Sequence, residues 1–299
     1  MKNTDSSTFA IGIDVGGSHI SSCVVDIEKG EVASAFVTTP IDSKASAKAI
    51  VDVFVKNIYE CKAQFDGEIA GVSFAIPGPF DYENGVSTIE GVSKYENIFG
   101  LDFPKTLQPA LWQLGIADFK FVNDASAFAL GECLCGAGRG AKKAVAITLG
   151  TGVGSGFVAE NHLVVSGDTV PAYGWVYHLP FENAIVDDAF STRWICKRYK
   201  ELTGTEVPGA KEVAELYGRQ AEATALFDEY GRRFAEFVVP VLKMFDAGLL
   251  ILGGNISRAY PCFGKELEAG MARLGYTVPV KTSLLLDKAA MIGAASLFV

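Results

Sequence analysis

The chain has 299 residues, of which 49% are hydrophobic and 20% are charged, and its formal net charge at pH 7 is −9. This length and composition allow two hydrophobic cores of ordinary domain size. The acidic balance and the lack of a Lys/Arg cluster argue against a nucleic-acid partner. The polar start MKNTDSSTF and the lack of any run of about 20 apolar residues predict a cytoplasmic protein with no membrane partner.

Alternating apolar patterns predict two similar halves. The first half is expected to contain strands 9–15, 19–26 and 31–38 as an antiparallel meander, then a helix over 44–64 and a strand over 68–76. The second half repeats this order with strands 143–149, 154–160 and 162–165, helices near 188–203 and 220–246, strand 248–252, a helix near 262–274, strand 277–282 and a closing helix. Pro240 is expected to kink or break the long helix. The repeated order predicts mixed sheets covered by helices.

The first functional motif is IGIDVGGSH, residues 11–19, in which an apolar strand delivers Asp14 into a glycine turn. Such a turn offers a carboxylate and backbone N–H groups to a phosphate and its metal ion. A related unit, AVAITLGTGVGSGF, follows at residues 144–157. Neither is a Walker A loop, because no Gly-Lys-Ser/Thr follows. Either turn alone fits an ordinary hairpin, but the pair favours phosphate binding.

A second kind of signal is Asp124, which ends the apolar run Phe121-Val122-Asn123 and opens an expected helix. Ligands of open α/β sheets bind at the carboxyl ends of strands. A carboxylate there could accept the proton of an attacking sugar hydroxyl, as a kinase requires. The alternative is that Asp124 only caps the helix.

Five segments in order resemble the ROK (repressor, open reading frame, kinase) family of sugar kinases. They are IGIDVGGSHI at 11–20, GVSFAIPGPFDYENG at 71–85, FVNDASAFALGE at 121–132, AVAITLGTGVGSGFV at 144–158 and FDAGLLILGGNIS at 245–257. The resemblance implies a ribonuclease H-like (actin-like ATPase) α/β fold of two duplicated lobes around an interlobe cleft. We expect an N-terminal lobe over 1–120, completed by a C-terminal helix at 287–299, and a C-terminal lobe over 121–286.

The resemblance also implies roles for individual residues. Asp124 is expected to be the catalytic base, and Asp14 is expected to position Mg²⁺ through water. ATP is expected to contact Asp14, Gly16, Gly17, Ser18, Thr148, Gly150, Thr151, Gly152, Gly154, Gly253, Gly254 and Asn255. The sugar is expected to contact Pro77, Gly78, Asn97, Asn123, Asp124, His178 and Asp187. By itself, the Gly253-Gly254 pair would suggest only a strand-to-helix turn.

The chain departs from the family pattern in Gly174-Trp175-Val176-Tyr177-His178, where typical members have Gly-Glu-x-Gly-His. Trp175 replaces the glutamate, and it could stack on a sugar ring or fill space. No cysteine lies between His178 and Cys196, so we predict that the family's structural zinc is absent. The six cysteines are expected to be reduced thiols. Asp187 is the nearest match to a later sugar-binding glutamate, while His178 could instead be a packing residue.

The sequence therefore predicts an ATP- and Mg²⁺-dependent sugar kinase, with the 6-hydroxyl of a hexose or N-acylhexosamine as the favoured acceptor. The family resemblance adds an expected homodimer. The alternatives are an inactive sugar-binding protein and a sugar-responsive transcription regulator. The second is disfavoured because about ten residues precede the first strand, too few for a helix-turn-helix domain. The sugar itself and the role of His19 are not determined by the sequence.

Overall fold

The computed structural model describes residues 8–91 and 94–298. It divides into two compact units: one contains the chain up to Cys135 and from Asp287 onward, and the other contains Gly136–Leu286. Each unit has a mixed β-sheet and its own hydrophobic core.

The first unit is built on a six-stranded sheet with the order β3-β2-β1-β5-β8, in which β4 also pairs with β2. Its strands are β1 (Phe9–Val15), β2 (His19–Asp26), β3 (Glu31–Val32), β4 (Val37–Pro40), β5 (Val72–Ala75) and β8 (Phe119–Val122). The small hairpin β6 (Phe80–Asp81) and β7 (Val86–Ser87) follows β5. Because β1, β5 and β8 run parallel, their carboxyl ends share one edge of the sheet.

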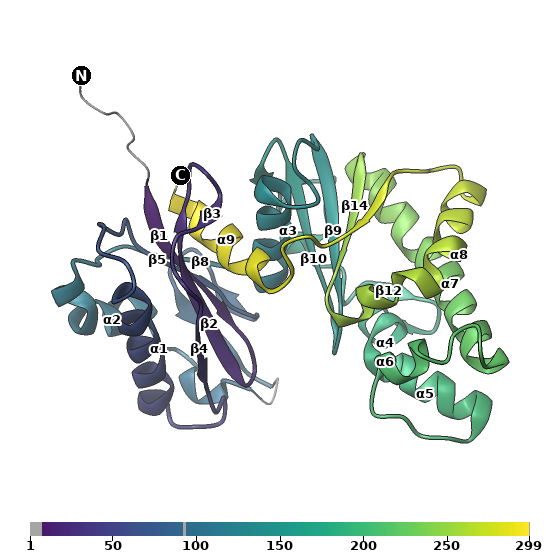
Figure 1. Ribbon diagram of the computed structural model, residues 1–299, viewed down its shortest axis with the longest axis horizontal. Helices are drawn as coiled ribbons and strands as arrows, with labels where there is room; N and C mark the ends of the chain where they lie inside the picture. The colour runs from purple at the N-terminus through teal and green to yellow at the C-terminus, as the bar shows by residue number, and fades with distance from the viewer. Residues whose placement is uncertain (1–7, 92–93, 299) are drawn as a thin grey trace. The chain divides into compact units, whose positions relative to one another are not determined.

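Helices cover both faces of this sheet. α1 (Ala47–Lys62) and α2 (Phe103–Leu111) lie on one side of it in Figure 1, and α9 (Ala289–Ala295) lies on the other. Ser46 caps α1, since its side chain accepts a hydrogen bond from Ala49 N–H at 3.3 Å. The buried side chains of α1, at Ile50, Phe54, Ile58 and Cys61, have the spacing of one helix face.

The C-terminal helix completes the first unit through very close backbone contacts. α9 packs against β1 and against α3 (Asp124–Cys135). A Cβ atom on Gly293 would lie 1.9 Å from the Ala127 carbonyl oxygen, and one on Gly131 would lie 2.0 Å from the Ala289 carbonyl oxygen. Only glycine permits this approach.

The second unit repeats the sheet order as β11-β10-β9-β14-β15. Its strands are β9 (Lys143–Leu149), β10 (Val153–Ala159), β11 (His162–Leu163), β14 (Leu249–Gly253) and β15 (Val280–Thr282), with a separate hairpin of β12 (Pro180–Phe181) and β13 (Ala184–Ile185). Its helices are α4 (Val186–Phe190), α5 (Thr192–Thr203), α6 (Ala210–Ala214), α7 (Ala221–Phe245) and α8 (Tyr260–Arg273). The repeated order of strands confirms the predicted mixed sheets.

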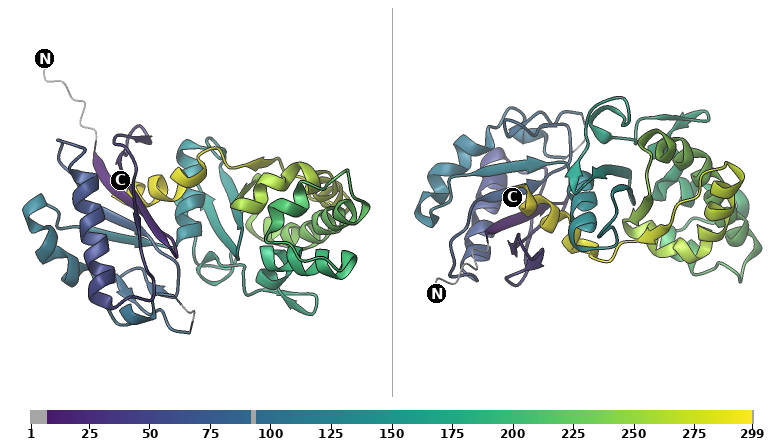
Figure 2. Two further views of the ribbon diagram at one scale, coloured as in Figure 1. Left: turned by 60° about the horizontal axis from the view of Figure 1, so that its bottom comes forward. Right: turned by 90° about the horizontal axis from the view of Figure 1, so that it is seen from above.

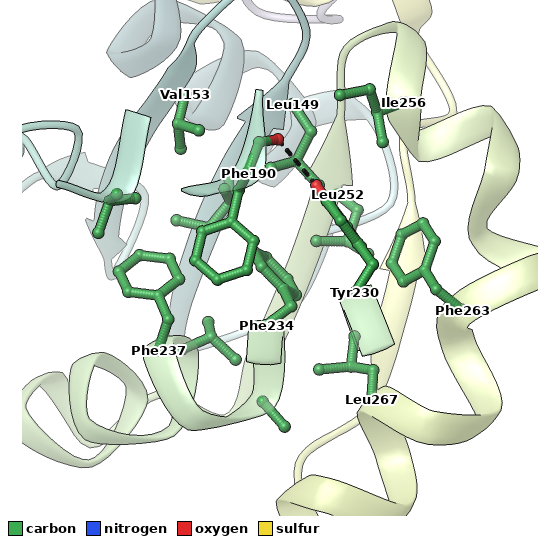
Figure 3. Packing of buried hydrophobic residues seen from close by; sticks show 14 of the residues in the cluster. Leu149, Val153, Phe190, Tyr230, Phe234, Phe237, Leu252, Ile256, Phe263 and Leu267 are labelled. Carbon is green, nitrogen blue, oxygen red and sulfur yellow. Dashed lines mark hydrogen bonds between the residues drawn. The ribbon is translucent and has the colours of Figure 1, made fainter. Parts of the chain in front are cut away.

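An aromatic cluster holds the helices of the second unit together. α7 and α8 run side by side in both views of Figure 2. Figure 3 shows Phe190, Tyr230, Phe234 and Phe263 in contact, with the Tyr230 hydroxyl donating to the Phe190 carbonyl at 2.9 Å. The buried hydroxyl thus has a partner, and it ties α7 to the end of α4.

Three expectations differ from the structure. The strand expected over 31–38 is divided into β3 and β4, because the Ser34 hydroxyl accepts the Val24 N–H and interrupts pairing with β2. α7 continues through Pro240 without a break. Its flanking residues Val239 and Val241 are buried, and this packing opposes the cost of the proline.

The third difference concerns the boundary between units, which was expected at residue 121. Instead, β8 pairs with β5 and α3 packs on α9, so both elements belong to the first unit. The division assigns the segment from Asp287 onward to the first unit.

Candidate active site

Two carboxylates lie at the carboxyl edge of the first sheet. Asp14 is the next-to-last residue of β1, and Asp124 lies two residues beyond the end of β8 and opens α3. Burial raises the pKa of Asp14 to about 7, with further contributions from the charges of Asp124 and Asp287. Burial also raises the pKa of Asp124, against hydrogen bonds that lower it. Two carboxylates that repel each other in a desolvated place are typical of catalytic and cation-binding sites.

The cap of helix α3 is shared between two residues. Asn123 Oδ1 accepts the N–H groups of Ala125 and Ser126 at 3.1 and 3.2 Å, while Asp124 Oδ1 accepts Ala125 N–H at 2.9 Å. Asn123 therefore supplies the expected cap. Asp124 shares this cap and is also hydrogen-bonded to the Asn123 side chain, a contact that lowers its pKa.

The first glycine turn follows Asp14 and is fastened from a distant segment. Gly16 N–H donates to His19 O at 3.0 Å, and the Tyr95 hydroxyl donates to Gly16 O at 2.6 Å. Ser18 and His19 are exposed and joined through Ser18 Oγ and His19 Nδ1 at 2.9 Å. Sequence reasoning missed Tyr95, whose backbone has a φ of 59°. Nothing in a lone tyrosine 79 residues away signals this contact.

The expected sugar-binding residues of the first unit lie in two places. Pro77 and Gly78 follow β5 after Ile76, at the same sheet edge as Asp14 at the end of β1 and Asn123 just after β8. Asn97 lies in a short 3-10 helix (Glu96–Ile98), where its Nδ2 donates to the Lys44 and Ala45 carbonyls at 2.9 Å each. Its amide nitrogen thus holds a loop, and only its oxygen remains for a ligand.

In the second unit, both predicted nucleotide motifs meet in one row across three strands. Thr148 of β9 pairs with Gly154 of β10 on one side and with Gly253 of β14 on the other. Gly254 has a φ of 76°, and a Cβ atom there would lie 2.3 Å from the Leu149 carbonyl oxygen. Asn255 follows and is exposed. Residues about 100 positions apart in sequence therefore form one surface.

The second glycine turn, Gly150–Gly152, joins β9 to β10 and closes through Gly150 N–H to Gly152 O at 2.9 Å. Glycine is favoured in a turn where the backbone needs a positive φ or approaches another group closely. None of Gly16, Gly17, Gly150, Gly152 and Gly154 has a positive φ. Close approach accounts for Gly152, since a Cβ atom there would lie 2.7 Å from Asp187 Oδ1, whereas a Cβ atom on Gly150 would have nothing within 4 Å.

Asp187 and His178 lie near this turn along one connected segment. Asp187 accepts Val153 N–H at 2.7 Å, and its own N–H donates to Tyr177 O at 2.9 Å. His178 is exposed beside the Tyr177 ring, with ring centroids 5.1 Å apart. Trp175 lies between Tyr173 and Tyr177, at centroid distances of 4.8 and 6.2 Å. The segment is therefore rich in aromatic surface.

Comparison with known proteins places the chain in a family. The family model described as "ROK family" matches residues 10–299. The chain belongs to the ROK family. Among the residues described, no group of three or more His, Cys, Asp or Glu side chains is arranged to hold a metal ion. Over the same residues, no helix is long and apolar enough to cross a membrane.

Two curated ROK relatives match almost their full length. The chain is 29% identical to a glucokinase of Thermotoga maritima, covering 96% of each protein, and 25% identical to an N-acetyl-D-glucosamine kinase of Haemophilus influenzae, covering 96% of this chain and 98% of the relative.

Among solved structures, a ROK family glucokinase from Streptomyces griseus in complex with glucose and AMPPNP superposes with a TM-score of 0.72 at 23% identity, covering 97% of this chain and 98% of that one. This likeness shows that the chain has the actin-like fold of ROK sugar kinases, as predicted.

Proposed function

We propose that this ROK protein is a kinase that transfers the γ-phosphate of ATP to the 6-hydroxyl of a hexose or N-acylhexosamine. Its relatives named glucokinase and N-acetyl-D-glucosamine kinase support the reaction class. The observation that carries the proposal is the pair Asp14 and Asp124 at one sheet edge, each with a pKa raised by burial.

Asp124 is the proposed base. Its carboxylate would orient the sugar hydroxyl and accept its proton as the oxygen attacks phosphorus. A raised pKa suits this role, because a carboxylate of ordinary pKa is a weak base at neutral pH. Asn123, Pro77, Gly78 and Asn97 are proposed to hold the other hydroxyls, together with His178 and Asp187 from the second unit.

Asp14 is the residue we propose for Mg²⁺, held through water. Neither Asp14 nor Asp124 has an ion-pair partner within residues 8–91 and 94–298, and the charge of Asp124 raises the cost of charging Asp14. This donor set fits a divalent cation, which prefers oxygen ligands. When bound, the ion would neutralise charge on the phosphates.

The glycine turns are proposed to bind the nucleotide. Gly16, Gly17 and Ser18 would face the terminal phosphates from the first unit, and Thr148, Gly150, Thr151, Gly152 and Gly154 would do so from the second. The row that also contains Gly253, with Gly254 and Asn255 beyond it, offers a backbone surface for adenosine. The family resemblance extends the proposal to a homodimer, which light scattering after size exclusion would test.

The decisive test is sugar-dependent release of ADP with ATP and Mg²⁺, across glucose, mannose, N-acetylglucosamine and N-acetylmannosamine. The 6-deoxy form of the active sugar is expected to give no turnover. Asp124→Asn keeps the oxygen that accepts Ala125 N–H, and we expect its kcat to fall at least about 1,000-fold with ATP still bound. Asp118→Asn is the matched control, since Asp118 is an exposed carboxylate just before β8.

Two results would contradict the proposal. Retained turnover in Asp124→Asn would show that Asp124 is only part of the helix cap. Sugar binding without ADP release in the wild-type protein would favour an inactive sugar-binding protein.

A further inference from the structure

The second glycine turn is held by a short segment that lies outside every nucleotide motif of the sequence. Thr192 donates to the Gly150 carbonyl oxygen twice, through N–H at 2.8 Å and through Oγ1 at 3.0 Å. Arg193 donates through NH1 to the Thr151 carbonyl oxygen at 2.9 Å. Two consecutive residues of the turn, Gly150 and Thr151, therefore have their carbonyl oxygens hydrogen-bonded to the start of α5.

Asp187 closes this arrangement from the other side. Its Oδ1 accepts Val153 N–H at 2.7 Å, and its Oδ2 accepts Arg193 NH2 at 2.6 Å. The Arg193 guanidinium thus bridges the Thr151 carbonyl and the Asp187 carboxylate. We call Asp187, Thr192 and Arg193 the turn clamp.

The turn clamp is suited to fixing geometry and poorly suited to adding stability. The side chains of Arg193 and Asp187 are 57% and 22% exposed, and ion pairs of this kind contribute about 0–1 kcal/mol to folding. The planar guanidinium, however, fixes the relative direction of two acceptors, which a lysine ammonium cannot do. The expected role is therefore to define the direction of backbone groups in the turn.

We propose that Arg193 is a positioning residue that, through Asp187 and Thr151, holds the Gly150–Val153 turn in the conformation that binds the phosphates of the nucleotide. The expected effect of Arg193 on catalysis rests on the proposed kinase function. Asp187, which the family resemblance assigns to the sugar, then has a second task. Both its oxygens accept hydrogen bonds, one from Val153 N–H and one from Arg193, so it links the sugar-binding segment with the phosphate turn.

The test compares Arg193→Ala and Arg193→Lys with Arg198→Ala. Arg198 lies on the same helix and pairs with Glu201 and Glu229 away from the turn, so it is the matched control. For Arg193→Ala we expect KM for ATP to rise about tenfold with kcat within about threefold, because the turn binds phosphates in ground and transition states alike. Arg193→Lys should recover only part of this, and Arg198→Ala should stay within about twofold.

A second readout needs no substrate. Hydrogen exchange of the Val153 amide in the ligand-free protein should accelerate at least about fivefold in Arg193→Ala, since Asp187 loses the group that orients it. Arg198→Ala should leave this amide unchanged. Unchanged exchange in Arg193→Ala would overturn the proposal, and so would a KM for ATP within twofold of the wild-type value.

These measurements separate the positioning role from the kinase reaction. If Arg193→Lys has the wild-type KM for ATP, the positive charge alone is sufficient, and the positioning role is overturned. If the wild-type protein binds AMPPNP but phosphorylates no sugar, the proposed function fails, and the dissociation constant of AMPPNP then replaces KM. Weaker AMPPNP binding by Arg193→Ala would in that case still support the turn clamp.

Discussion

At the scale of single residues, the site combines groups whose charged forms are costly with groups that fix the backbone. Asp14 and Asp124 belong to the first kind, because burial raises the pKa of both. Tyr95 and Arg193 belong to the second, since each holds a glycine turn through a carbonyl oxygen. Sequence motifs reveal the buried carboxylates, but the residues that hold the glycine turns depend on contacts between distant segments.

Asp187 illustrates what a single sequence can and cannot provide. Its place after Gly174–His178 in the family order marked it as a candidate ligand. The sequence could not show that Val153 N–H and Arg193 occupy its two oxygens, because hydrogen-bond geometry depends on the folded turn. Its role toward the sugar stays a prediction.

The raised pKa of Asp14 predicts a pH-dependent stability for the metal-free protein. Its folded pKa of about 7 exceeds its ordinary value of 3.8, so the folded state holds a proton that the unfolded state loses above about pH 4. The free energy of unfolding should therefore fall as pH rises from about 4 to about 7. Because one pKa unit corresponds to about 1.4 kcal/mol, Asp14→Asn should be about 2–4 kcal/mol more stable than wild type at pH 8.

Urea unfolding at pH 4 and pH 8, with a chelator present, measures this effect. At pH 4 the carboxyl group is protonated in the folded state and only about half ionised in the unfolded state, so the variant and the wild type should differ little there. A variant that is no more stable at pH 8 would show that Asp14 is charged at little cost in the folded protein.

At the scale of elements, local pattern predicted some strands fully and others only in part. The spans 9–15, 19–26 and 143–149 agree with the bounds of β1, β2 and β9. The span 31–38 does not, since a serine side chain replaces a backbone partner at Val24. α7 shows the reverse case, in which core packing overrides a local helix breaker.

The contact between α3 and α9 gives an element-scale prediction. A methyl group on Gly293 would lie 1.9 Å from the Ala127 carbonyl oxygen, so the helices must separate to admit it. We expect Gly293→Ala to lower the free energy of unfolding by about 3 kcal/mol or more, as overpacking against rigid backbone does.

Gly248→Ala is the control for this substitution. A methyl group there would lie 3.6 Å from the Lys143 carbonyl oxygen, which is an ordinary contact, and its φ is not positive. The change should stay within about 1 kcal/mol. Equal stabilities of the two variants in thermal unfolding would mean that α9 can shift at little cost.

At the scale of the whole molecule, the second unit is one continuous segment inserted between α3 and α9. Gly136–Leu286 carries its own sheet and its own core, whereas the first unit needs chain from both ends. The expected boundary at residue 121 falls inside the strand β8, Phe119–Val122. The structure assigns that strand by its pairing with β5, a contact 47 residues apart that local sequence does not encode.

This arrangement predicts that residues 136–286 fold when produced alone, because a core of this size needs no further staple. The matching test piece is residues 8–135, alone or joined to 287–299 by a short Gly-Ser linker. The linked form restores the packing of Gly131 against Ala289 and should unfold cooperatively. The form without α9 exposes the apolar faces of β1 and α3, so it should not unfold cooperatively. Circular dichroism and thermal unfolding of the three pieces distinguish these outcomes. A cooperative transition in residues 8–135 alone would show that α9 is dispensable for the first unit.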